Sequence, residues 1–175
     1  MSSGLRTALT VLLAAVIGAG GGIFAVAWLQ QSPEGPITRP LFSLPELDGP
    51  RRSISDWDGE VIVLNFWATW CTPCREEIPL FTQLQTEFAD AGVQFLGIAI
   101  DDPEPMRGFL AQVNMGYPTL YGMQSALDVA AAYGNDRGTL PYTVIIDRNG
   151  HIIQTMSGQL HEPQLRPILE DLAGG

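Results

Sequence analysis

The 175-residue chain contains no lysine and has few cysteines and histidines. All nine of its basic residues are arginines, they face 19 acidic residues, and the net charge is −10. Nucleic-acid binding needs clustered positive charge, and no such run occurs, so no nucleic-acid partner is expected. Only two cysteines are present, three positions apart. A disulfide scaffold needs more cysteines at wider spacings, whereas one close pair is typical of a redox site.

The cysteine pair stands where an apolar segment meets a predicted helix. Cys71-Thr72-Pro73-Cys74 follows the apolar residues 64–70 and precedes Arg75-Glu76-Glu77-Ile78. The free N–H groups and the dipole at a helix N-terminus stabilise a thiolate on the first cysteine. We therefore predict that Cys71 is the nucleophile, beside Trp70 where a partner can reach it. Cys74, three residues on and on the same helical face, is the predicted resolving thiol that closes a Cys71–Cys74 disulfide.

Other uses of the cysteine pair remain open at this point. A zinc site usually needs four ligands, and only His151 and His161, both remote in sequence, could complete one, so no metal is expected. A dithiol that holds Cu(I) is chemically possible because thiolates are soft ligands. An inert disulfide closing so short a loop would remove little chain entropy. No organic cofactor is required, and no nucleotide-binding loop is present.

Two further features near the pair have both a functional and a structural interpretation. Glu77 follows Cys74 by three residues and projects toward the same side of the helix. It either tunes the thiols and moves a proton, or is a solvated acid favoured by the helix dipole. Leu140-Pro141 opens a second apolar strand, and general statistics favour a trans bond there.

An uncharged apolar segment begins the chain. Residues 7–29 carry no charge and are long enough to span a bilayer core of roughly 30 Å. We expect residues 1–6 to be a cytoplasmic tail and residues 7–29 a transmembrane anchor or a cleavable signal segment. Residues 30–40, rich in proline, are the predicted linker, and residues 41–175 the predicted domain. Either form of the segment exports that domain.

The remaining sequence alternates between strand and helix patterns. Strands are predicted at 60–67, 93–100, 117–121, 141–147 and 151–156, and helices at 74–89, 102–116, 126–133 and 162–172. Asp102 is the predicted capping acid of the second helix. A strand-like run at 41–44 and the Asp48-Gly49 turn signal indicate an N-terminal hairpin. This order predicts an α/β domain with a mixed sheet.

Several of these segments together resemble one family. Residues 67–79 resemble the active-site segment of TlpA/ResA-type thioredoxin-like proteins, residues 138–150 resemble their second signature, and residues 42–49 their N-terminal hairpin. The resemblance implies a thioredoxin fold with an added N-terminal hairpin and a central insertion. It also implies a cis Leu140–Pro141 bond beside Cys71, where Trp70, Leu140 and Pro141 bind an extended partner segment. In such proteins an acid at the position of Glu77 influences the thiols.

The resemblance further implies a function and a location. The expected protein is a membrane-anchored thiol:disulfide oxidoreductase, single-pass in the cytoplasmic membrane, with its catalytic domain in the periplasm. Implied partners are protein disulfides, with apocytochrome c or a maturation chaperone as examples, and a membrane electron donor that re-reduces the pair. Whether the enzyme reduces, oxidises or isomerises disulfides depends on a potential that sequence patterns do not give.

One residue departs from the pattern of cytosolic thioredoxins. Those proteins have a buried acid where this chain has Asn65. Asparagine cannot act as a base. Proton handling is therefore expected to fall to Glu77, to water or to no group at all. Peroxiredoxins share the fold but lack the Trp-Cys-X-X-Cys pattern, so peroxidase activity is not expected.

Overall fold

The computed structural model describes residues 35–174, and from Pro36 onward these belong to one compact unit that spans Pro36–Gly175. The predicted tail at 1–6, the apolar segment at 7–29 and the first half of the predicted linker lie outside the described residues. Among residues 35–174, no helix is both long and apolar enough to cross a bilayer.

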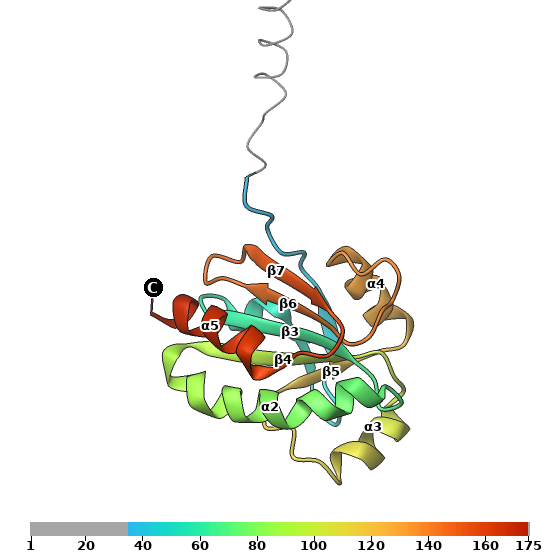
Figure 1. The fold of residues 1–175 in the computed structure, drawn as a ribbon. Helices are drawn as coiled ribbons and strands as arrows, with labels where there is room; N and C mark the ends of the chain where they lie inside the picture. Colours follow the sequence, from blue (N-terminus) through green and yellow to red (C-terminus); the bar gives the residue numbers. More distant parts are fainter. Residues whose placement is uncertain (1–34, 175) are drawn as a thin grey trace, which may run out of the picture. The chain divides into compact units, whose positions relative to one another are not determined.

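A five-stranded mixed sheet forms the centre of the domain, in the order β5-β4-β3-β6-β7 (Figure 1). Its strands are β3 (Val61–Trp67), β4 (Val93–Ala99), β5 (Thr119–Tyr121), β6 (Tyr142–Ile146) and β7 (Ile152–Ser157). The first three are parallel, with Trp67 opposite Ala99 and Ala99 opposite Tyr121. β6 runs antiparallel to β3, and β7 antiparallel to β6. The carboxyl ends of β3, β4 and β5 therefore meet at one edge of the sheet.

Helices cover both faces of this sheet. They are α2 (Thr72–Phe88), α3 (Pro103–Leu110), α4 (Gln124–Ala132) and α5 (Glu162–Ala173), with short 3-10 helices η1 (Ile54–Trp57) and η2 (Ala89–Ala91). Val61, Val63 and Trp67 of β3 pack with α2, α3 and α5, whereas the alternate β3 residues pack with α4 and η1. Every residue of β3 is buried, as expected of a central strand covered on both faces.

The N-terminal hairpin and the central insertion are both present. β1 (Ser43–Pro45) and β2 (Arg51–Ser53) pair antiparallel, and Asp48 in the turn between them has a φ of 59°. The insertion consists of α3 and β5, between β4 and α4, and β5 extends the parallel side of the sheet. The domain therefore has a thioredoxin-like fold with the two additions that the family resemblance implied.

The predicted helix at 102–116 is wrong in its second half. α3 ends at Leu110, and Thr82 of α2 donates a hydrogen bond of 2.6 Å to the carbonyl of Met115. Residues 111–116 are thereby held as a loop against α2. Asp102 does occupy the N-cap of α3, but its side chain makes no capping hydrogen bond, so the predicted capping role is also wrong.

Candidate active site

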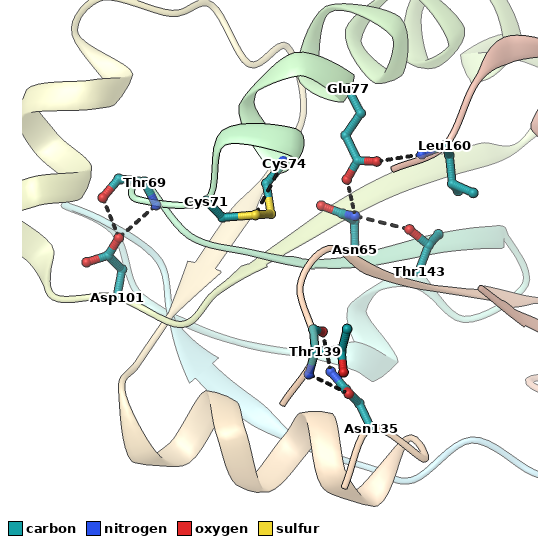
Figure 2. Close-up of a disulfide and its surroundings, with 10 residues drawn as sticks. All are labelled: Asn65, Thr69, Cys71, Cys74, Glu77, Asp101, Asn135, Thr139, Thr143 and Leu160. Carbon is teal, nitrogen blue, oxygen red and sulfur yellow. Dashed lines mark hydrogen bonds between the residues drawn. A yellow bond between two sulfur atoms is a disulfide. The ribbon is translucent and has the colours of Figure 1, made fainter. Parts of the chain in front are cut away.

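Cys71 and Cys74 are joined by a disulfide where β3 leads into α2 (Figure 2). Cys71 is the N-cap residue of α2, and its sulfur accepts a hydrogen bond of 3.3 Å from the backbone N–H of Cys74. Cys71 retains 6% exposure, and Cys74 is fully buried. Sequence predicted this pairing and this order of accessibility. An N–H group of the first helical turn thus already points at the Cys71 sulfur, where it would stabilise a thiolate.

The residues predicted to bind a partner are Trp70, Leu140 and Pro141. Trp70, directly before Cys71, is 66% exposed. The Leu140–Pro141 bond is cis, as the resemblance implied and general statistics did not. Leu140 packs against the apolar cluster that contains both cysteines. The side chain of Asn135 braces the chain leading to this bond. Its Nδ2 donates to the carbonyl of Thr139 at 2.8 Å, and its Oδ1 accepts from the N–H of Thr139 at 2.9 Å.

Glu77 lies inside the protein, one helical turn after Cys74. The side chain is only 1% exposed, so the solvated alternative is wrong. Its Oε1 accepts a hydrogen bond of 2.9 Å from Asn65 Nδ2, and its Oε2 accepts one of 3.1 Å from the N–H of Leu160. Burial raises the pKa of Glu77 to about 7, although both hydrogen bonds lower it. A carboxyl group with this pKa can gain and lose a proton near neutral pH.

Asn65 links Glu77 to the strand that follows the cis proline. Its Nδ2 also donates to Thr143 Oγ1 at 3.1 Å, and both residues are buried. Its Oδ1 is buried without a hydrogen-bond partner. The hydroxyl of Tyr117 is likewise buried and unpartnered, and burial together with the negative charge of Glu77 raises its pKa.

Sequence reasoning missed Asp101, which anchors the loop before Cys71. Its Oδ2 accepts from the N–H of Thr69 at 2.9 Å and from the Thr69 hydroxyl at 2.6 Å, while its Oδ1 accepts from the N–H of Asp102. Asp101 is buried and lies two residues after the end of β4, at the same sheet edge as the cysteines. An acid placed immediately after a buried strand was the signal that could have identified it.

A match to a family model decides the classification. The model described as AhpC/TSA family matches residues 38–155, which is more than half of the chain. The chain belongs to the AhpC/TSA family. Curated relatives of this AhpC/TSA member include thiol-disulfide oxidoreductase ResA of Geobacillus kaustophilus, 30% identical, and of Geobacillus thermodenitrificans, 29% identical. Each alignment covers 96% of this chain and 94% of the relative.

Solved structures place this AhpC/TSA member beside thiol:disulfide interchange proteins. A thiol:disulfide interchange protein of the thioredoxin family, from Chlorobium tepidum TLS, superposes with a TM-score of 0.72 at 27% identity. The alignment covers 82% of this chain and all of that chain. A candidate DsbE from Chlorobium tepidum has a TM-score of 0.72 at 28% identity, covering 80% and 97%. With the disulfide at the start of α2, these findings identify a thiol–disulfide oxidoreductase of the ResA/DsbE type.

No metal centre is evident in the described part of this AhpC/TSA member. Among residues 35–174, no group of three or more His, Cys, Asp or Glu side chains is placed to hold a metal ion. His151 contacts Asp147 in the turn after β6, at the end of the sheet away from the cysteines. His161 directly follows Leu160, the residue whose N–H bonds Glu77, so it lies closer to the site than its sequence distance suggested.

Proposed function

We propose that this protein is a periplasmic disulfide reductase, anchored in the cytoplasmic membrane by residues 7–29. The observation that carries the proposal is the pairing of an N-capping, partly accessible Cys71 with a buried Cys74 and a buried Glu77. The first sulfur is placed to meet a partner and the second to be protected from it. The pKa of Glu77 is about 7, so its carboxyl group can exchange a proton at neutral pH.

The reaction begins at Cys71. Its thiolate attacks one sulfur of the partner's disulfide, so the partner's S–S bond breaks and a mixed disulfide forms between Cys71 and the partner. The partner's second sulfur leaves as a thiolate and takes a proton from water. Trp70 and the backbone beside the cis proline at Leu140–Pro141 hold the partner segment in an extended form during this step.

Resolution then takes place at Cys74. The Cys74 thiol gives its proton to the Glu77 carboxylate and attacks the Cys71 sulfur, which closes the Cys71–Cys74 disulfide and releases the reduced partner. Two electrons pass from the enzyme to the partner in the full cycle. Glu77 afterwards releases its proton to water, and a membrane electron donor returns the pair to the dithiol.

Cytochrome c maturation is the pathway we propose for this reductase. The partner would be the haem-binding cysteines of an apocytochrome, or a maturation chaperone that carries them. Support comes from the resemblance to ResA and DsbE proteins. A partner of this kind presents two cysteines in a Cys-X-X-Cys-His segment.

A peptide exchange experiment tests the direction of the reaction. The reduced full-length chain is mixed with a peptide that carries an oxidised Cys-X-X-Cys-His segment, and the oxidised chain with the reduced peptide. A reductase converts the first mixture to oxidised chain and dithiol peptide and leaves the second nearly unchanged. If only the second mixture reacts, the protein is an oxidase and the proposed direction is wrong.

Sidedness is tested by labelling Cys71 from outside the cytoplasmic membrane. In spheroplasts of cells that express the full-length chain, a membrane-impermeant maleimide is expected to label reduced Cys71 without lysis. Labelling that requires lysis would place the domain on the cytoplasmic side and contradict the proposed location. A Cys71→Ser variant controls for labelling at Cys74.

A further inference from the structure

The amide of Asn65 has one side fully bonded and the other side free. Its nitrogen donates both hydrogens, to Glu77 Oε1 at 2.9 Å and to Thr143 Oγ1 at 3.1 Å. Its oxygen has no partner, although the side chain is only 1% exposed. Buried acceptors are nearly always satisfied in folded proteins, so an unpartnered one beside a reactive centre calls for a partner that another state of the protein supplies.

Glu77 fixes which way this amide points. The Glu77 carboxylate has no hydrogen to donate, and its Oε1 lies 2.9 Å from Asn65 Nδ2, so the amide presents its N–H₂ group to Glu77 rather than its oxygen. The oxygen is then directed to the opposite side. Figure 2 shows the amide between the disulfide and Thr143, with its oxygen on the side of the disulfide.

Cys74 is the sulfur that this oxygen can meet. Cys74 and Glu77 are three residues apart on α2, so their side chains are neighbours on one helical face, and Glu77 is bonded directly to Asn65. In the disulfide, neither sulfur carries a hydrogen. Reduction leaves Cys74 as a buried thiol whose S–H is a donor, and Asn65 Oδ1 is a buried acceptor to which the described residues supply no partner.

We propose that Asn65 is a positioning residue that accepts the S–H hydrogen bond of Cys74 in the reduced enzyme. This inference rests on the proposed function, because it assigns the residue that holds the resolving thiol. The bond exists in the dithiol and is absent from the disulfide, so Asn65 favours the reduced state. The same amide holds Glu77 with its nitrogen and Cys74 with its oxygen, which keeps the resolving thiol beside the carboxylate. The S–H then turns from Asn65 to Glu77 when the proton is transferred during resolution.

Infrared spectroscopy of the Cys74 S–H stretching band tests the bond directly. The full-length Cys71→Ser chain has Cys74 as its one cysteine, so the band belongs to a single group. Asn65→Leu in this background removes the acceptor at similar volume, and the band is expected to move to higher frequency. Asn65→Val serves as the second version, because valine suits a buried strand should leucine prevent folding.

Thr143→Val is the matched control, because it removes a partner of the same amide on the side away from sulfur. In this variant the band is expected to stay where the parent has it. Asn65→Asp retains an acceptor, so the band is expected to stay at the lower frequency of the parent. A band that Asn65→Leu and Asn65→Val leave unmoved, or that Thr143→Val moves equally far, would overturn the proposal.

The equilibrium with glutathione gives a second readout in the chain that retains both cysteines. Without the bond, the dithiol loses an interaction and the disulfide loses an unsatisfied acceptor. Asn65→Leu is therefore expected to make the pair about tenfold harder to reduce, which is a potential about 30 mV more negative. An equilibrium within twofold of the parent contradicts the proposal. If the parent pair does not interconvert between disulfide and dithiol, the proposed function fails. The S–H band still tests whether Asn65 accepts the hydrogen bond of Cys74.

Discussion

Replacing Cys74 with serine is expected to turn the enzyme into a trap for its partner. The Cys74→Ser chain retains Cys71, so it still attacks a disulfide, but the fully buried resolving sulfur is missing. Steady-state reduction of insulin should fall by about a thousandfold or more, while a mixed disulfide at Cys71 accumulates toward one per chain. The product is measured by non-reducing electrophoresis and by mass spectrometry before and after treatment with dithiothreitol.

The same change at the other cysteine is the matched control. Cys71→Ser should also abolish turnover, but it should accumulate no mixed disulfide, because Cys74 is buried beneath the helix start and cannot meet a partner. Equal trapping by both variants would mean that either sulfur can attack. The assignment of a nucleophile and a resolving thiol would then be wrong.

Glu77→Gln is expected to slow the resolution of the mixed disulfide by about a hundredfold at pH 8, a typical contribution of general base catalysis. With the pKa of Glu77 at about 7, the wild-type rate should rise as pH increases through neutrality and the carboxylate forms. The variant should lose that rise. Stopped-flow mixing of a preformed Cys71 mixed disulfide, followed by release of a fluorescent thiol, measures the rate.

Glu76→Gln controls for a charge change on the same helical turn. Glu76 is exposed, and its removal should leave the pH profile of resolution unchanged. A Glu77→Gln profile that coincides with wild type would exclude Glu77 as the proton acceptor. A loss of the rise in both variants would assign it to the charge of the helix start rather than to Glu77.

The buried carboxyl group should also appear in the pH dependence of stability. Folding raises the pKa of Glu77 from its ordinary value of 4.5 to about 7, so between these values the folded state keeps a proton that the unfolded state has released. The unfolding free energy should therefore fall as pH rises from 4.5 to 7, by about 3 kcal/mol in total. Urea unfolding of oxidised residues 36–175 should show this loss relative to Glu77→Gln, in which the group does not titrate.

The redox pair and the frame around it could be predicted from sequence because their signals are local. All of these signals lie within residues 61–78. They are the apolar strand, the helix start that follows it, and the spacing of three residues between the cysteines. The strands are likewise set by short patterns of apolar residues. The cis bond at Leu140–Pro141 was predictable only through family resemblance, since local statistics favour trans.

The polar contacts of the site could not be predicted, because they join residues far apart in the chain. Glu77 is bonded to Asn65, 12 positions away, and to Leu160, 83 positions away. Asp101 reaches Thr69 across 32 positions. Whether an acid near a helix start is solvated or buried depends on what the fold lays over it, and here the segment before α5 covers Glu77. The end of α3 was missed for a similar reason, since Thr82 of α2 holds the chain beyond it.

The most direct test is whether the two sulfurs interconvert between disulfide and dithiol in the intact protein. The full-length chain is equilibrated in glutathione buffers of graded ratio, quenched with acid, alkylated and weighed by mass spectrometry. We predict that Cys71 and Cys74 become alkylated together, with one midpoint and full reversal on reoxidation. A pair that stays closed at every ratio, or cysteines that are alkylated independently, would contradict the exchange reaction on which the proposed function rests.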